Sequence, residues 1–187
     1  MGNKCLYCYT PLINDENDFH PACSKKIFGT QTPPIVDFGI NEISDLAAKI
    51  LGKSISVTGV QPKLSIDVEK NKKQRLTIVG LYGKYILKPP FEKYNQMPEI
   101  EDLTMHLAEI VRIKTAQHSL IKLKSGELSY ISKRFDRNNC EKLHVEDMAQ
   151  LTGMLTEQKY RGSMEIIAKK IQAYSDFPGN DIIRLFE

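Results

Sequence analysis

Apolar residues recur along this chain with two different periods, and the changes of period predict where helices and strands lie. From Asn41 onward the apolar positions follow helical spacing and share one face, at Ile43, Leu46, Ala47, Ile50 and Leu51. Asn41 is a favourable N-cap and Gly52 a favourable stop, because asparagine caps free amides and glycine accepts a left-handed backbone. The pattern therefore predicts a short amphipathic helix between these two residues.

Three strand-like runs follow this helix. Residues 64–68, 76–79 and 84–88 alternate apolar with polar positions or are rich in β-branched side chains. Polar or glycine-containing turns at 70–73 and 80–83 separate the runs. The pattern predicts three consecutive antiparallel strands arranged as a meander.

Helical spacing then returns and is followed by a hairpin. The apolar positions of this second helix are Ile100, Leu103, Leu107, Ile110 and Val111, with Pro98 tolerated in the first turn. Two apolar runs flank a glycine-containing turn and predict a hairpin, at 119–123 and 128–132. Beyond residue 140 the pattern is helical, at 144–153, 163–174 and 181–187.

The first forty residues show neither period. Residues 1–30 hold three of the four cysteines and are predicted to be irregular, and Pro33 with Pro34 favours an extended linker. The whole chain has the composition of a folded protein, with 41% hydrophobic and 26% charged residues. We therefore expect one main domain with a small addition at its amino-terminal side.

Charge and hydropathy exclude several partners. The net charge of +3 is too small to attract nucleic acid or an anionic membrane, so neither is expected to bind directly. No apolar run approaches the roughly 20 residues of a membrane helix, and the start of the chain lacks an uninterrupted apolar signal region. We expect a cytoplasmic protein, whose cysteines are metal ligands or free thiols rather than disulfides.

The amino-terminal cysteines and a histidine form two pairs with the same spacing. The pairs are Cys5 with Cys8 and His20 with Cys23, each separated by two residues. Four such ligands suit tetrahedral zinc, and a site with four protein ligands would be structural because no position is left for water. The alternative is a set of incidental thiols beside a surface histidine. Cys140 stands apart and is expected to be an inert or exposed thiol.

A loop rich in small residues precedes the first predicted strand. Residues 56–63 read Ser-Val-Thr-Gly-Val-Gln-Pro-Lys, with Ser56, Gly59 and Lys63 as candidate ligands. Small residues let backbone amides approach phosphate oxygens, and the lysine adds a positive charge. The loop lacks the Walker pattern, so that class of nucleotide hydrolase is not supported. An ordinary loop before a strand is the alternative.

Lys88 closes the third predicted strand, and acidic residues follow on the next helix. A carboxylate on the inward side of that helix could orient the Lys88 ammonium, with Glu101 the better candidate and Glu99 the alternative. A loop, three strands, a helix and two strands is also the order of a protein-kinase small lobe, in which such a lysine neutralises nucleotide phosphates. A solvated lysine at the end of a strand is the alternative.

Several motifs in order carry a resemblance to a known family. They are Ser-Val-Thr-Gly-Val-Gln-Pro-Lys-Leu at 56–64, Ile-Leu-Lys-Pro at 86–89, Lys-Arg-Phe-Asp-Arg at 133–137, His-Val-Glu-Asp-Met-Ala-Gln at 144–150 and Lys-Tyr at 159–160. As a set, over about residues 50–187, they resemble the HipA-like serine/threonine kinases, toxins of bacterial toxin–antitoxin and persistence modules. The amino-terminal segment departs from the best-known members, which begin with a β-rich subdomain.

The resemblance implies roles for individual residues. Ser56 matches the autophosphorylated serine, Lys88 the nucleotide-phosphate lysine, and Glu101 its helical partner. Lys133 and Phe135 match the hinge that meets adenine, and the alternative for this segment is a charged hairpin exit with one buried Phe. The family's catalytic and magnesium-binding residues would lie beyond Glu187, so we expect this portion alone to be inactive and magnesium to need the other half.

These inferences combine into one expectation. The fold is predicted to be α+β, with a zinc-binding segment and linker at 1–40, a kinase-like small lobe and hinge at 41–137, and the start of a helical large lobe at 138–187. The expected function is the ATP-binding portion of a HipA-like kinase toxin, partnered by an antitoxin or a carboxy-terminal kinase half. The alternative function is a zinc-bearing regulatory module that acts through a protein partner without nucleotide.

Overall fold

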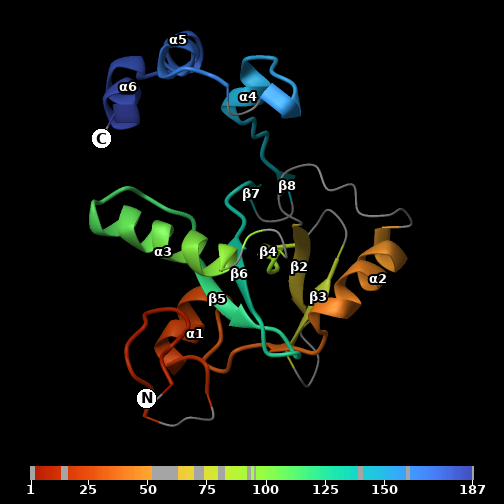
Figure 1. Ribbon diagram of the computed structural model, residues 1–187. Helices are drawn as coiled ribbons and strands as arrows, with labels where there is room; N and C mark the ends of the chain where they lie inside the picture. Colours follow the sequence, from red (N-terminus) through yellow and green to blue (C-terminus); the bar gives the residue numbers. More distant parts are fainter. Residues whose placement is uncertain are drawn as a thin grey trace. The chain divides into compact units, whose positions relative to one another are not determined.

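The computed structural model describes most of the chain and divides it into two compact units (Figure 1). The described residues are 3–13, 17–51, 63–69, 74–79, 83–91, 94, 96–138, 141–158 and 161–186. The first unit is Met1–Glu141 and the second is Lys142–Glu187. The division expected near residue 40 falls inside the first unit.

The first unit is built on a mixed sheet of six strands in the order β1-β3-β2-β4-β6-β5. These strands are β1 (Ile35–Val36), β2 (Leu64–Glu69), β3 (Arg75–Ile78), β4 (Tyr85–Lys88), β5 (His118–Lys122) and β6 (Leu128–Lys133). Neighbouring strands are antiparallel except β1 and β3, which are parallel. Together with the helices this confirms the predicted α+β class.

The predicted meander is wrong in its pairing, although its three strands are present. β4 pairs with β2, not with β3, so β2 lies between the other two. Gly83, shortly before β4, lies against the backbone of β2: its amide donates to Ser65 Oγ at 3.1 Å, and a Cβ on it would come within 2.6 Å of the Ile66 carbonyl oxygen. Only glycine fits so close an approach of two backbones.

The strands place their apolar side chains on one face of the sheet. Because side chains alternate along a strand, Leu87 enters the main core while Lys88 points to the opposite face. The core contains residues from β2, β3, β4 and β6 together with Ile27 of α1 and Ile43 of α2. The opposite face of β5 and β6 contacts α3 (Met97–Ile110).

A helix occupies part of the segment expected to be irregular. α1 spans Pro21–Phe28 and buries Ile27 and Phe28, and α2 spans Ile40–Leu51 as expected. Pro21 suits the first turn, and Gly29 follows the helix at φ 81°, a left-handed value that ends helices. The helical pattern of α1 is weak, because this short helix buries only two large apolar residues, Ile27 and Phe28. The cysteine spacing was therefore the stronger feature of this segment.

α3 confirms the predicted helix but contacts the sheet through its polar side. Its buried residues are Pro98 and Asp102. The apolar positions that revealed the helix are exposed in the described part of the chain, at Ile100, Leu103, Leu107, Ile110 and Val111. The polar contacts described below account for this orientation, because they give the buried carboxylate of Asp102 its partners.

The second unit is helical. It contains α4 (Met148–Leu151), a 3-10 turn η1 (Thr156–Gln158), α5 (Met164–Tyr174) and α6 (Pro178–Phe186), and a short ribbon of β7 (Arg137–Asn138) and β8 (Glu141–Lys142) lies at the junction. The helix expected at 144–153 is much shorter than predicted, because Asp147 and Gln150 form a capping box that starts it only at Met148. None of the described helices has the length and apolar character of a membrane span.

Candidate functional site

Lys88 and Glu101 form an ion pair between β4 and α3. Both side chains keep partial exposure, 29% for Lys88 and 28% for Glu101, so the pair is open to a ligand from solvent. The Lys88 ammonium also lies 5.4 Å from the centre of the Tyr130 ring, close enough for a cation–π attraction. The lysine therefore has a carboxylate on one side and an aromatic ring against it.

The local fold explains why these three residues meet. Strand alternation turns Lys88 away from the core, and the antiparallel register places it directly opposite Tyr130 of β6. α3 begins after a short connection, with Pro98 in its first turn, and carries Glu101 over the same face. The carboxylate that contacts Lys88 is thus that of Glu101, the candidate that the sequence favoured over Glu99.

The loop ahead of β2 contributes one described candidate. Lys63 is exposed and directly precedes Leu64, whose partner across the strands is Leu87. Lys63 and Lys88 therefore lie at the same end of two neighbouring strands. Ser56 and Gly59 lie outside the described residues, so their predicted roles stay predictions.

The two hinge candidates lie at the other end of β4. Lys133 ends β6 opposite Tyr85 and is exposed, and Phe135 is 72% exposed. The structure thus does not bring Lys133 or Phe135 into contact with the Lys88–Glu101 pair. A planar ring left in solvent beside a strand end is available for stacking on a ligand.

An ionic cluster next to the hinge candidates was missed by sequence reasoning. Arg134 donates two hydrogen bonds to Asp136, at 2.8 and 2.7 Å, and Arg137 donates a third to the same carboxylate at 2.7 Å. The hydrogen bonds from Arg134, with the positive charge of both arginines, outweigh burial and lower the pKa of Asp136 to about 2. The alternating charges of this motif were the available signal.

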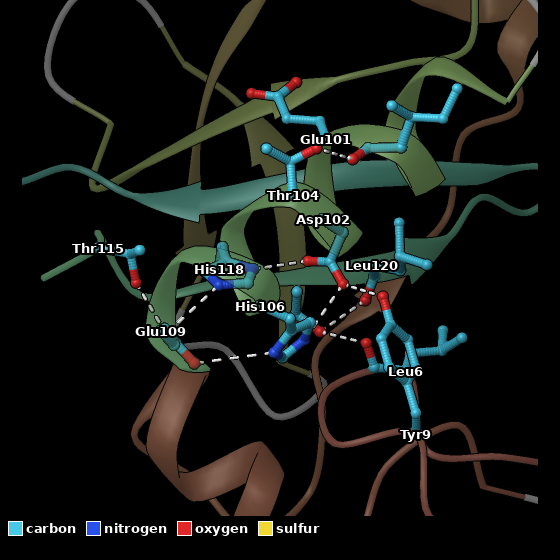
Figure 2. A network of polar contacts seen from close by, with 12 residues as sticks. Leu6, Tyr9, Glu101, Asp102, Thr104, His106, Glu109, Thr115, His118 and Leu120 are labelled. Carbon is cyan, nitrogen blue, oxygen red and sulfur yellow. Dashed lines mark hydrogen bonds and ion pairs between the residues drawn. The ribbon is translucent and has the colours of Figure 1, made fainter. Parts of the chain in front are cut away.

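A second polar network, also not predicted, surrounds Asp102 on the sheet side of α3 (Figure 2). Asp102 is fully buried and accepts hydrogen bonds from the Tyr9 hydroxyl and from His118 Nδ1, the latter at 2.7 Å. His106 Nε2 approaches the same carboxylate at 3.4 Å. Tyr9 lies 93 positions from Asp102 in the sequence, so no local pattern could have indicated the contact.

The network changes the acidity of its members. Burial alone would lower the pKa of His118, but its hydrogen bond to Asp102 and the negative charges of Asp102 and Glu109 raise that pKa above its usual value. The hydrogen bond from Thr115, assisted by His118 and His106, lowers the pKa of Glu109. Burial and the Asp102 carboxylate raise the pKa of Tyr9, so this hydroxyl stays protonated and donates.

The four amino-terminal candidates come together in space. The ligand atoms of Cys5, Cys8, His20 and Cys23 all lie within 4.8 Å of one another. His20 Nδ1 is 3.4 Å from Cys8 Sγ and 3.9 Å from Cys23 Sγ. Cys5 and Cys8 come from a turn, whereas His20 is the N-cap of α1 and Cys23 lies in its first turn.

Two donor atoms of this cluster, Nδ1 of His20 and Sγ of Cys8, are available to a cation. His20 Nε2 contacts the Pro11 carbonyl at 3.2 Å, and because a carbonyl can only accept, the proton lies on Nε2 and the Nδ1 lone pair faces the sulfurs. Burial opposes ionisation of Cys8, but hydrogen bonds from Thr10 and the neighbouring thiols lower its pKa to about 6. Burial and the neighbouring sulfurs raise the pKa of Cys23 to about 12.

Comparison with known proteins identifies the family. The model of the HipA-like C-terminal domain matches residues 55–187. The chain is 30% identical over 155 residues to "Putative kinase Y4dM" of Sinorhizobium fredii, covering 75% of this chain and 37% of that protein. It is 31% identical over 113 residues to the serine/threonine-protein kinase toxin HipA of Shewanella oneidensis, covering 57% of this chain and 25% of the toxin.

A further relative matches a larger share of the chain. "Putative kinase Y4mE" of Sinorhizobium fredii is 25% identical over 172 residues, which is 84% of this chain and 40% of that protein. The chain thus spans 25–40% of the length of these three relatives. Since the family model covers well over half of the residues, the chain belongs to the family of HipA-like proteins.

Proposed function

We propose that this chain is the ATP-binding portion of a HipA-like serine/threonine protein kinase. The observation that carries the proposal is the Lys88–Glu101 ion pair between a sheet strand and the helix that follows it. In protein kinases a strand lysine paired with a helix glutamate holds the nucleotide phosphates. The order of β2, β3, β4, α3, β5 and β6 supports the same assignment, as does membership in a family with kinase-named relatives.

Each candidate residue has a task in this proposal. The Lys88 ammonium would neutralise phosphate oxygens, while Glu101 and the Tyr130 ring hold its position, so that less side-chain entropy is lost on binding. Lys63 would add a second positive charge at the same end of the sheet. Ser56 and Gly59 would belong to the phosphate-facing loop, with Ser56 the site of autophosphorylation, and Lys133 with Phe135 would receive the adenine.

We expect binding without turnover by these 187 residues alone. Phosphoryl transfer needs a residue that orients the accepting hydroxyl and residues that hold magnesium, and kinases supply these from the large lobe. By the family resemblance, we expect those residues to lie outside these 187. A polypeptide that provides them, or an antitoxin, is the partner that this proposal implies.

Calorimetric titration with ATP tests the proposal. The chain should bind ATP, and Lys88→Ala should reduce the affinity at least roughly ten-fold, the usual effect of losing a charged hydrogen bond. Lys124→Ala is the control, because Lys124 is an exposed lysine in the turn between β5 and β6 and has no assigned role in nucleotide binding. Equal affinities of the Lys88→Ala and Lys124→Ala variants would contradict the role of Lys88.

The same titration separates this function from its rival. A zinc-bearing module that acts through a protein partner has the Cys5–Cys23 cluster as its supporting observation and needs no nucleotide. Absence of any ATP binding by a folded, metal-loaded chain would favour that rival.

A further inference from the structure

The amino-terminal loop carries both a metal-ligand set and a side chain that reaches α3. We propose that Cys5, Cys8, His20 and Cys23 bind one zinc ion, and that the loop closed by this ion positions α3 through the hydrogen bond from Tyr9 to Asp102. The metal site stands by itself. Its consequence for Glu101, which is the next residue to Asp102, rests on the proposed nucleotide-binding function.

The geometry of the four ligands matches zinc. A tetrahedral ion with bonds of about 2.3 Å to sulfur and about 2.0 Å to nitrogen places its donor atoms roughly 3.5–3.8 Å apart. The two distances from His20 Nδ1 to sulfur, 3.4 and 3.9 Å, lie on either side of this range. Three cysteine sulfurs and one imidazole are ligands that favour zinc over magnesium or calcium. The Pro11 carbonyl orients the histidine as an outer partner would.

The ion would join two separate pieces of backbone. The turn from Cys5 to Cys8 is shaped by hydrogen bonds from Cys5 N to Thr10 O at 3.0 Å and from Tyr9 N to Cys5 O at 2.9 Å. α1 supplies the other two ligands and is anchored in the core through Ile27 and Phe28. Zinc would therefore fix the turn, and Tyr9 directly after it, against a rigid part of the unit.

Tyr9 has an unusual backbone conformation for a residue with a side chain. Its φ is 60°, a left-handed value that side-chain-bearing residues rarely adopt and that favours glycine. A tyrosine held there has its hydroxyl on Asp102 and its ring 5.0 Å from the His106 ring. A strained backbone conformation persists only where surrounding contacts hold it in place, and the contacts of the Tyr9 side chain with Asp102 and His106 are of this kind.

The turn lies at the free edge of β5, so it can reach both faces of the sheet. Leu120 N and Ser119 Oγ of β5 both donate to the Leu6 carbonyl, at 3.2 and 3.0 Å. Cys5 is buried in the core on one face, whereas Tyr9 contacts α3 on the other. Figure 2 shows Leu6 and Tyr9 beside β5, with Asp102, His106 and His118 next to them.

Two contiguous routes lead from Tyr9 to the ion pair. One passes through Asp102 to Glu101 along a single turn of α3. The other passes through stacked and edge-on rings, from His106 to His118 at 4.7 Å and from His118 to Tyr130 at 6.0 Å, and Tyr130 lies under Lys88. Displacing Tyr9 would therefore disturb both partners of Lys88. Energetic coupling through such a network is tested by removing one link at a time.

Metal analysis tests the first half of the proposal. Chain purified without chelator should contain one zinc per molecule, Cys8→Ser should lose it, and Cys140→Ser should keep it. Cys140 is the control because it is the one cysteine outside the predicted set. Metal-free wild-type protein that cannot take up added zinc would overturn the site.

Hydrogen exchange of the α3 amides tests the second half. Tyr9→Phe keeps the ring and the zinc but removes the hydroxyl, and exchange in α3 should become roughly ten-fold faster, as expected for losing a hydrogen bond to a charged group. Tyr7→Phe removes a hydroxyl from the same turn and should change neither zinc nor exchange. Cys8→Ser should also accelerate α3. Unchanged exchange in both Tyr9→Phe and Cys8→Ser would refute the coupling.

A further variant separates strain from contact. Tyr9→Gly relieves the left-handed backbone and should retain one zinc, yet its α3 should exchange as fast as in Tyr9→Phe. Slow, wild-type exchange in Tyr9→Gly would contradict a role for the side chain. None of these readouts uses nucleotide, so zinc and the α3 response can be established even if ATP does not bind. That result would refute the proposed function and leave the metal site and its hold on α3 intact.

Discussion

Glu101 and Asp102 are adjacent acidic residues on α3, but their surroundings differ in almost every respect. Glu101 pairs with a lysine and is 28% exposed, whereas Asp102 is fully buried between Tyr9 and His118. A partly exposed pair can exchange one partner for a ligand, because water and salt already share its charges. A buried carboxylate with two donors cannot, since losing either donor leaves the buried charge only partly compensated.

The comparison separates the residue that serves a ligand from the one that holds the helix. Asp102 fixes the rotation of α3 on the sheet, and this rotation exposes the apolar stripe that contains Ile100 and Leu103. The same rotation brings Glu101 over Lys88. The accessible pair therefore depends on the buried one.

The largest effect should come from removing the buried carboxylate. Asp102→Ala leaves the Tyr9 hydroxyl and His118 without their acceptor, and we expect a loss of about 3 kcal/mol in the free energy of unfolding. Urea denaturation measures it. Glu101→Ala is the matched variant and should cost under about 1 kcal/mol. Equal losses of unfolding free energy in the two variants would contradict the different roles assigned to Asp102 and Glu101.

Sequence patterns predicted the partly exposed Lys88–Glu101 pair but not the buried network around Asp102. The periods predicted the strands and α3, and the order of elements placed Lys88 near Glu101. Asp102 could not be assigned in this way, because its partners Tyr9 and His118 come from a loop and a strand far apart in the chain. Hydrophobic periodicity assumes that apolar residues face inward, which fails for α3.

The strand order and α1 were missed for related reasons. Alternation identifies a strand but not its neighbour, so it could not show that β4 pairs with β2 rather than β3, with Gly83 close against the backbone of β2. α1 is short and its helical signal is weak beside the cysteine spacing. By contrast, the spacing of the Cys5 and His20 pairs did anticipate that their four side chains would converge.

A rise in pH should weaken the buried network by a smaller amount. The raised pKa of His118 means that the folded state holds its proton more tightly than the unfolded chain does. Its contribution is therefore complete below the unfolded pKa and is lost as pH rises through the folded value, so stability should fall as pH rises above the ordinary histidine pKa of 6.5. The loss stays below that of Asp102→Ala because neutral His118 can still donate to Asp102.

Thermal unfolding as a function of pH measures this effect. His118→Gln keeps a polar group beside Asp102 without a proton to release, so it should be less stable than wild type but show a flatter profile over the same range. The groups that face His118 are Asp102, His106 and Glu109, together with Tyr130. A His118→Gln profile as steep as that of the wild type would assign the pH dependence to another group.

Acid should loosen the cluster beside the hinge candidates, with a weaker effect on the whole unit. The pKa of Asp136 is about 2, below its ordinary value of 3.8, so its contribution is present above that ordinary value and is lost as pH falls through the folded one. The effect should be local because Arg134 and Arg137 come from the same short segment. Stability measured between about pH 4 and pH 2 should decline less steeply in Asp136→Asn. Parallel curves would show that other carboxylates cause the decline.

The smallest effect on stability should come from Lys88 itself. Lys88→Met keeps an unbranched stem against the Tyr130 ring and removes only the charge, and Glu101, released from its partner, is exposed enough to be hydrated. Without ATP the free energy of unfolding should change by less than about 1 kcal/mol. ATP affinity should nevertheless fall as it does in Lys88→Ala, because the phosphate contact is gone in both. A destabilisation near that of Asp102→Ala, with ATP affinity unaltered, would make Lys88–Glu101 a structural contact and reverse the roles assigned to the two acids.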